Sequence, residues 1–393
     1  MRRTLTITQS GSQRSVRDTG LGAPSCYGCG VAVALLVLGS VAGAVGPEAV
    51  DDISPPASAR QREATLRIAC FNAENLAVPG EETRLTRYRF EPARRRHFER
   101  IAAVIETLAP DIIVMPEVLS SAGVEALVRL LHEKGIQDFQ GYHIDSRDHF
   151  SGFDVAVLSR IEPDDIDGAK IHLYVPQRKQ ASRDRKPAED LGLTVDDAWL
   201  QESYASTDDL GKERVRTAVL QRHAVVYFTV RGRKIGLLGL HLKSNPSESA
   251  SNAQRMAETK IACEIVKRKI IANGYLPVVL GDINDYDPDV PMADSVRMTQ
   301  TTVLRNLKNY DDAAVGDELV NVARYIPRVA DRYTSHWDFN ENGVADRDDV
   351  FTMIDHVLVH RELVPTISRV FICHAFDLDV SDHFPVVVDF NLD

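Results

Sequence analysis

A carboxylate and an amide stand two residues apart at the end of a short apolar run. The run 278–281 (VVLG) predicts a buried strand with a tight exit at its glycine, and Asp282 and Asn284 follow. At the two-residue period of an extended chain both side chains point the same way. A carboxylate holds a metal ion or accepts a proton, and an amide donates to an anionic oxygen without adding negative charge. The pair suits phosphate-ester hydrolysis, although an ordinary polar turn after a strand has the same composition.

Other apolar runs end on polar side chains of the same kinds. They are Asn72 after 66–71, Glu117 after 111–116, His241 after 234–240, and Asp382 with His383 before 386–388, while Asp355 lies within the predicted strand 351–359. Because Asp355 and His356 are consecutive in that strand, they face opposite sides, and only one of them can face a site. Each segment alone has an ordinary structural explanation. The ordered set predicts one site at the ends of several strands.

The elements between these segments follow from hydrophobic periodicity. Helices are expected over about 95–108 and over 251–272, where apolar residues recur at helical spacing. Two further strands are expected, 218–230 and 234–240, joined by a turn at 231–233. The polar stretch 162–213 shows no strong periodicity and is expected to be a long loop.

The composition describes an ordinary globular protein. The chain has 393 residues, of which 44% are hydrophobic and 26% charged, so it can bury a substantial core. Its net charge of −11 argues against a general polyanion binder, whose affinity comes from lysine and arginine neutralising phosphates. A nuclease with a local basic groove is still compatible with this charge. The cysteines Cys70, Cys263 and Cys373 lie in apolar surroundings and are expected to be buried free thiols.

The first 64 residues have a different character. Four arginines precede an apolar run at 31–45 that contains Ala42-Gly43-Ala44, which indicates a signal peptide over 1–45 with a cleavage site. The run is short for a membrane span, and the alternative is an uncleaved N-terminal anchor that leaves the protein facing outside. Residues 46–64 are expected to be a disordered linker. The protein is therefore expected to be secreted or periplasmic.

The segment 338–349 has the pattern of a twelve-residue calcium loop. Oxygen side chains fall at positions 1, 3, 5, 9 and 12, and a glycine at position 6 allows the sharp turn. The expected Ca²⁺ ligands are Asp338, Asn340, Asn342, Val344 through its carbonyl, Asp346 and Asp349. Aspartate rather than glutamate at position 12 has a shorter arm and requires tighter loop closure. The alternative is a solvated turn rich in Asp and Asn.

The ordered motifs together resemble the endonuclease/exonuclease/phosphatase superfamily. It includes pancreatic-type deoxyribonucleases, abasic-site endonucleases, neutral sphingomyelinases and inositol polyphosphate 5-phosphatases. The resemblance covers about 66–392 and rests on RIACFNAENL, PDIIVMPEV, GLHLKSN, VVLGDINDYD, MIDHVLV and SDHFPV, in that order. It implies an α/β fold over 65–393, a four-layer α/β/β/α sandwich of two mixed β-sheets with outer helices, in which 338–349 is an insertion. One departure is Pro116, where the family often has glutamine.

The resemblance also implies roles for individual residues. Glu117 is the main ligand of a Mg²⁺ or Mn²⁺ ion, helped by Asn72 and Asp382. Asp282 and Asn284 handle the attacking water and the phosphoryl oxygens.

The histidines complete the implied site. His383 forms a His–carboxylate pair with Asp355, and His241 contacts the phosphate or acts on the acid side. Either Asp282 or His383 is the general base. These roles are chemically coherent, because hydrolysis needs a divalent ion, a base near water and donors to the non-bridging oxygens.

The expected function is that of a secreted, metal-dependent phosphodiesterase, an extracellular nuclease acting as a monomer on nucleic acid. Two alternatives within the same chemistry are a phospholipase C-like enzyme of the sphingomyelinase type and an inositol- or sugar-phosphate phosphatase. An alternative of another class is a non-catalytic secreted binding module that keeps the fold. No obligate protein partner is evident from the sequence.

Overall fold

The structure is a computed structural model. It describes residues 65–78, 81, 91–146, 148, 151–176, 195–207, 211–292, 301–311, 318–338, 349–376 and 380–393. All of these belong to one compact unit, Asp51–Asp393. The predicted signal peptide 1–45, the linker 46–64 and the interior of the calcium loop lie outside the described residues. Among the helices of the described ranges, none has the length and apolar character needed to cross a membrane.

One six-stranded sheet combines segments from both ends of the described chain. Its order is β15-β16-β1-β2-β4-β3. The strands are β1 (Thr65–Cys70), β2 (Ile112–Val118), β3 (Gln140–Tyr142), β4 (Asp154–Ser159), β15 (Ile367–Ile372) and β16 (Val386–Asn391). The sheet is mixed, because β1 runs parallel to β2 and antiparallel to β16.

The other six-stranded sheet is built from the middle of the chain. Its order is β11-β14-β10-β9-β8-β5. The strands are β5 (Ile171–His172), β8 (His223–Val230), β9 (Arg233–His241), β10 (Leu276–Asp282), β11 (Leu319–Asn321) and β14 (Asp355–His360). This sheet is also mixed, since β10 runs parallel to β9 and antiparallel to β14.

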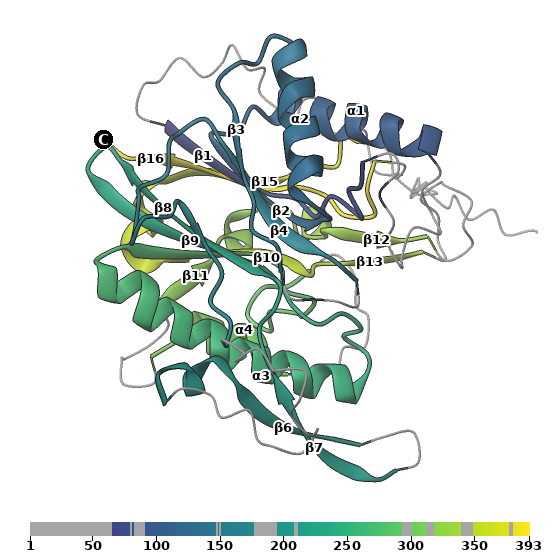
Figure 1. The fold of residues 1–393 in the computed structure, drawn as a ribbon, viewed down its shortest axis with the longest axis vertical. Coiled ribbons are helices and arrows are strands. Elements are labelled where there is room, and N and C mark those ends of the chain that lie inside the picture. Colours follow the sequence, from purple (N-terminus) through teal and green to yellow (C-terminus); the bar gives the residue numbers. More distant parts are fainter. Residues whose placement is uncertain are drawn as a thin grey trace, which may run out of the picture. The chain divides into compact units, whose positions relative to one another are not determined.

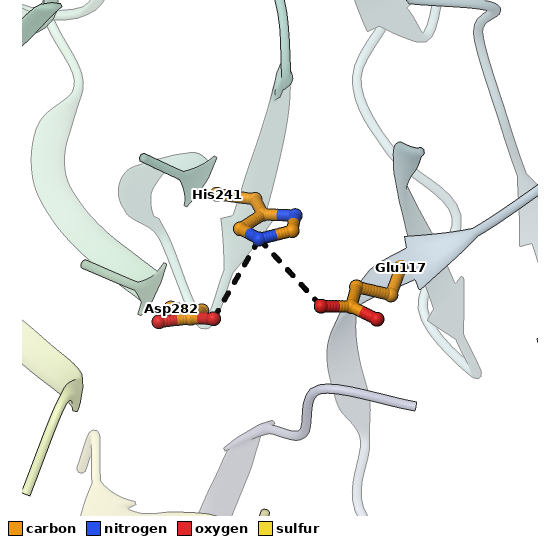
Figure 2. Close-up of side chains that lie close together, drawn as sticks. All are labelled: Glu117, His241 and Asp282. Atoms are coloured by element: carbon orange, nitrogen blue, oxygen red, sulfur yellow. Dashed lines mark ion pairs between the residues drawn. The ribbon is translucent and has the colours of Figure 1, made fainter. Parts of the chain in front are cut away.

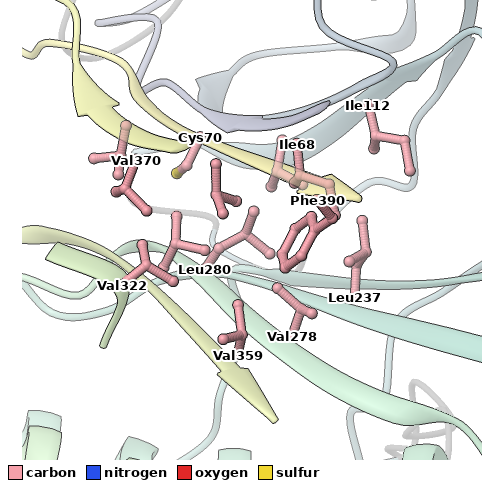
Figure 3. Close-up of a cluster of buried hydrophobic side chains, with 14 of the residues drawn as sticks. Ile68, Cys70, Ile112, Leu237, Val278, Leu280, Val322, Val359, Val370 and Phe390 are labelled. Carbon is pink, nitrogen blue, oxygen red and sulfur yellow. The ribbon is translucent and has the colours of Figure 1, made fainter. Parts of the chain in front are cut away.

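The two sheets pack face to face over a shared apolar core. Ile68 and Cys70 of β1 point into this core, where they meet Val278 and Leu280 of β10 (Figure 3). Because side chains alternate along a strand, Ala69 faces the opposite way, towards the helices outside the first sheet. Cys70, Cys263 and Cys373 are all buried thiols that form no disulfide with one another, as expected.

Helices cover the outer face of each sheet (Figure 1). Helices α1 (Glu91–Leu108) and α2 (Ser121–Glu133) pack on the first sheet, and α3 (Ser249–Ile265) and α4 (Val303–Lys308) pack on the second. The order of layers is therefore helix, sheet, sheet, helix, which confirms the predicted α/β/β/α sandwich. The remaining helical turns are a π-helical turn at Val266–Ile270 and 3₁₀ turns at Val195–Leu200, Ile271–Asn273, Val322–Tyr325, Val329–Asp331 and Arg361–Thr366.

Two small two-stranded sheets show where the predicted strand boundaries were wrong. The hairpin β6 (Glu202–Thr207) and β7 (Glu213–Ala218) occupies part of the stretch expected to be loop, so that expectation was wrong there. The predicted strand 218–230 is in fact the end of β7 and all of β8. The predicted strand 351–359 is likewise divided between β13 (Val350–Thr352), which pairs with β12 (Ser335–Trp337), and β14.

Candidate active site

Strand register aligns three of the predicted site residues. In the second sheet Asp282, the last residue of β10, is paired with His241 of β9 on one side and with Asp355 of β14 on the other. Because residues paired in register lie side by side across neighbouring strands, the carboxylates and the imidazole are held at one edge of the sheet. Asp355 thus begins a strand rather than lying in the middle of one.

The first sheet supplies Glu117 through an irregular strand end. The pairing of β2 with β4 shifts register between Pro116 and Val118, and Glu117 between them has a left-handed φ of 62°. A non-glycine residue in this conformation costs about 1–3 kcal/mol. The strained backbone is held in place: Leu76 N donates to the Glu117 carbonyl at 2.8 Å, and Asn75 N donates to its Oε2 at 3.0 Å.

Glu117, His241 and Asp282 point towards one another (Figure 2). His241 Nε2 lies 3.7 Å from Glu117 Oε1 and 3.6 Å from Asp282 Oδ2. The Asn72 Nδ2 donates to both carboxylates, at 3.2 Å to Glu117 and 3.1 Å to Asp282. The Asn72 Oδ1 accepts from Glu74 N at 2.9 Å. In this arrangement Asn72 bridges the two acids through its amino group.

Burial and the neighbouring negative charges penalise the ionised form of these acids, and a bound cation would offset that penalty. Burial, followed by the charge of Asp382, raises the pKa of Glu117. Burial, followed by the charge of Asp355, raises the pKa of Asp282 to about 7. Carboxylate oxygens are the ligands that Mg²⁺ and Mn²⁺ prefer, and ligand atoms of Glu117, His241 and Asp282 lie within 4.8 Å of one another. The residues therefore fit a divalent metal ion.

His383 and Asp355 form the second half of the site. The His383 Nδ1 lies 2.7 Å from Asp355 Oδ2, and its Nε2 lies 4.0 Å from Asp282 Oδ2. Burial alone lowers the pKa of His383, but the carboxylates of Asp355, Asp382 and Asp282 outweigh it and raise this pKa well above the ordinary value. Asp282 therefore lies between the two imidazoles of the site.

The remaining predicted residues lie around this centre. Asp382 is at the rim, with a half-exposed side chain whose Oδ1 is 3.9 Å from His383 Nε2. Asn284 is buried, and its Nδ2 donates to the Leu242 carbonyl at 3.3 Å. His356 faces away, as strand geometry requires, with Nε2 2.9 Å from the Asp285 carbonyl. All eight predicted residues of the phosphoesterase site are thus placed in or beside one cluster.

The structure describes only the two ends of the predicted calcium loop 338–349. Asn340, Asn342, Val344 and Asp346 lie outside the described residues. Asp338 directly follows Trp337, and Asp349 directly precedes Val350. Because Trp337 and Val350 are paired, the two ends of the loop are close. Asp349 is buried, and its Oδ2 lies 2.7 Å from His336 Nε2.

Two residues were missed by the sequence reasoning. Arg222 lies just before β8, where its Nη2 donates to the Leu242 carbonyl at 3.0 Å and its Nη1 lies 3.5 Å from His241 Nε2. Burial and the charge of Arg222 together lower the pKa of His241 well below its ordinary value. Glu74 accepts from Asp382 N through its Oε2 at 3.0 Å. Arg222 gave no signal because 218–230 looked like one uninterrupted strand.

A cavity of about 400 Å³ adjoins the cluster on the side of His241. Its lining includes Glu117, Phe153, Arg222, His241, Lys243 and Gln254. Phe153 stacks on His241 with ring centroids 5.8 Å apart. The wall of the cavity is both polar and apolar, and the cations Arg222 and Lys243 lie there among the acids Glu117, Asp148 and Glu258.

A two-sheet sandwich with buried acids and histidines at its strand ends is suited to hydrolysis in which a cation and a histidine would act together. The sequence itself identifies the class further. Residues 69–383 match the endonuclease/exonuclease/phosphatase family. The chain therefore belongs to this family and is a hydrolytic phosphoesterase.

Three solved structures are similar to this chain at low identity, and the first of them shares its fold. An AP endonuclease from Archaeoglobus fulgidus is 16% identical, with a TM-score of 0.52 over 83% of this chain and 99% of that one. The 3′ phosphatase NExo from Neisseria, bound to a product DNA hairpin, is also 16% identical, with a TM-score of 0.49 over 83% and 99%. TDP2 from D. rerio, complexed with a single-strand DNA product, is 14% identical, with a TM-score of 0.46 over 84% and 100%. No curated protein matches the chain.

Proposed function

We propose that this phosphoesterase is a secreted, Mg²⁺-dependent phosphodiesterase, and specifically an extracellular nuclease. The observation that carries the proposal is the position of Asp282 between the Glu117–His241 group and the His383–Asp355 pair. This arrangement brings a cation site, a proton-transfer group and hydrogen-bond donors to one point. Hydrolysis of a phosphodiester needs all three.

The chain's residues divide this work between them. Glu117 and Asp282, with Asp382 at the rim, would hold the Mg²⁺ or Mn²⁺ ion, while the Asn72 amino group holds the two acids in place rather than offering its oxygen as a ligand. When bound, the ion would neutralise negative charge on the phosphoryl group. Asp355 orients the His383 ring by binding its Nδ1, which leaves Nε2 directed towards Asp282. Either Asp282 or His383 then accepts the proton of the attacking water.

The cavity supports a polar, anionic substrate. Arg222 and Lys243 line it together with the amide side chain of Gln254. These two cations can bind phosphate oxygens although the lining also holds Glu117, Asp148 and Glu258 and the chain as a whole carries a net charge of −11. This polarity favours a nucleic acid, which presents further phosphates on either side of the one that is cleaved.

A lipid-headgroup phosphodiesterase is a second candidate because of two exposed apolar side chains. Among the described residues, Val215 on the β6–β7 hairpin is 80% exposed and Trp337 on β12 is 61% exposed. The cavity wall includes Thr217, two residues beyond Val215. The isolated apolar residues offer less to a membrane than a continuous patch would.

Plasmid nicking tests the nuclease directly. Purified protein should convert supercoiled DNA to nicked and linear forms with Mg²⁺, and EDTA should stop the reaction. Glu117→Gln removes a carboxylate without changing the side-chain volume much, and should lower the rate at least about 100-fold.

The same preparation should be offered sphingomyelin vesicles and inositol phosphates. Hydrolysis of these compounds without DNA nicking would overturn the nuclease assignment and keep the phosphoesterase. Full Mg²⁺ binding and unchanged activity in both Glu117→Gln and His383→Ala would favour a non-catalytic binding module.

The loop 338–349 is proposed to bind Ca²⁺ as a structural clasp. The pairing of Trp337 with Val350 supports this, since it brings loop positions 1 and 12 close together. Calorimetric titration of wild type with Ca²⁺ should show a binding isotherm that Asp338→Ala abolishes or weakens strongly. Identical traces for the two proteins would contradict the proposal.

Secretion is proposed from the leader sequence. Mass spectrometry of protein produced in a secreting host should find a mature N-terminus near residue 45. Recovery of the intact leader in the membrane fraction would favour the anchored alternative.

A further inference from the structure

Thr334 is a buried residue whose hydroxyl contacts the backbone beneath the His383–Asp355 pair. Its Oγ1 accepts hydrogen bonds from Ile354 N at 3.0 Å and from Asp355 N at 2.9 Å. The side chain is completely buried, so water does not compete for these two N–H groups. The contact lies at the break between β13 and β14, where regular strand pairing stops.

The backbone of Thr334 contacts both segments that carry the pair. Thr334 N donates to the Thr352 carbonyl at 2.8 Å, on the side that leads to Asp355. On the other side, Phe384 N donates to the Thr334 carbonyl at 2.7 Å, directly after His383. One residue therefore connects the segment 352–355 to the segment that contains His383.

The Asp355 backbone is held by the pairing of β14 with β10 and by the Thr334 hydroxyl, and this matters because the Asp355 side chain has few other contacts. Its Oδ2 binds His383, while its Oδ1 is buried and has no hydrogen-bond partner within the described ranges. The carboxylate is therefore placed by its backbone and by His383 alone. A shift of the Asp355 backbone would move the carboxylate away from His383 Nδ1.

We propose that Thr334 is a positioning residue that sets the distance between Asp355 and His383 and thereby the orientation of the His383 ring. The inference rests on the hydrolytic function proposed above. Thr334 does not touch the reacting atoms; it acts through Asp355. Small displacements of a catalytic group reduce the rate of the chemical step far more than they reduce substrate binding.

Hydrolysis of bis(4-nitrophenyl) phosphate with Mg²⁺ provides the kinetic test. Thr334→Val keeps the shape but removes the acceptor, and should lower kcat about 10- to 100-fold while KM stays within about twofold. Thr334→Ser keeps the hydroxyl and should retain kcat within about threefold. Thr334→Ala also lacks the hydroxyl without adding bulk, and serves the same purpose if the valine variant does not fold.

Ser159→Ala is the matched control. The Ser159 hydroxyl is also buried and accepts from a backbone N–H, that of Ile161, at 3.0 Å. Ser159 is paired with Ile112 at the start of β2, roughly 17 Å from Glu117 at strand spacing. The control should lower the melting temperature to a similar extent and leave kcat unchanged. Equal kcat in the valine, alanine and serine variants of Thr334 would overturn the proposal.

A measurement without substrate separates this inference from the proposed function. Spectra of ¹⁵N-histidine-labelled protein should show a downfield Nδ1 proton for His383 in wild type and Thr334→Ser, and its loss in Thr334→Val. If wild type hydrolysed no phosphodiester, the proposed function would fail while this signal still decided the role of Thr334. An unchanged His383 signal in the valine and alanine variants would refute the positioning role.

Discussion

The buried histidine at the start of β8 predicts how the fold responds to acid. His223 is 1% exposed, and both of its ring nitrogens have backbone partners. Its Nδ1 lies 3.1 Å from the Leu220 carbonyl, and its Nε2 accepts from Tyr174 N at 3.0 Å. A neutral ring satisfies both bonds with one N–H and one lone pair. A second proton on Nε2 would place two donors against each other.

The size of the effect follows from the shift in pKa. Burial lowers the pKa of His223 from 6.5 to about 3. Between these values the unfolded chain binds a proton that the folded chain does not, so stability is full above pH 6.5 and falls as the pH decreases. Each pH unit is worth about 1.4 kcal/mol. At pH 5 this one group therefore removes about 2 kcal/mol from the free energy of unfolding.

Urea unfolding at pH 7 and pH 5 measures this loss. His223→Gln keeps an acceptor for Tyr174 N but does not titrate, so the variant should lose about 2 kcal/mol less than wild type between the two pH values. Val226→Ala creates a cavity on the same strand and changes no titratable group. This variant should therefore lose the same free energy of unfolding relative to wild type at pH 7 and at pH 5. If wild type and His223→Gln lost the same free energy on acidification, the neutral buried ring would not be the cause.

Two further substitutions test the packing behind the site. Arg255 is fully buried, and its Nε lies 2.8 Å from Asp285 Oδ2. Arg255→Leu leaves the buried carboxylate of Asp285 without its cation and should lower the free energy of unfolding in urea by about 3–5 kcal/mol. A loss below about 1 kcal/mol would contradict this. Gly281 has a φ of 145°, and a Cβ added there would lie 1.9 Å from the Leu240 carbonyl oxygen. Because this clash is with the backbone, Gly281→Ala should abolish the cooperative melting transition. Gly232→Ala, which meets open space at a φ of 76°, should lower the melting temperature only slightly, and equal effects of the two alanines would refute the steric argument.

The layers and the meeting of the site residues could be predicted from the sequence. The alternation of side chains along 66–71 and 278–281 determines which of them enter the shared core. The polar side chains lie at the strand ends because burying them in that core would cost free energy. The order of the motifs then limits which ends can be neighbours. Because a strand places consecutive side chains on opposite faces, only one of Asp355 and His356 could face the site, and the structure shows that it is Asp355.

The missed features depend on contacts between residues far apart in sequence. The break between β13 and β14 lies inside an apolar run, and the hydroxyl that accepts the freed N–H groups belongs to Thr334, 20 residues before Ile354. Arg222 likewise joins the site through the carbonyl of Leu242, 20 residues later. Periodicity reports only local patterns, so neither contact leaves a signal in a window of a few residues.

The pairing of β1 with β16 determines when the fold can be completed during synthesis of the chain. Arg67 and Asp389, which form a buried ion pair between these strands, are 322 residues apart. The first strand has no neighbour on that side until the ribosome has synthesised nearly everything that follows. Asn72 and His383, which flank the same two strands, therefore come together late, so a partly synthesised chain lacks the completed site.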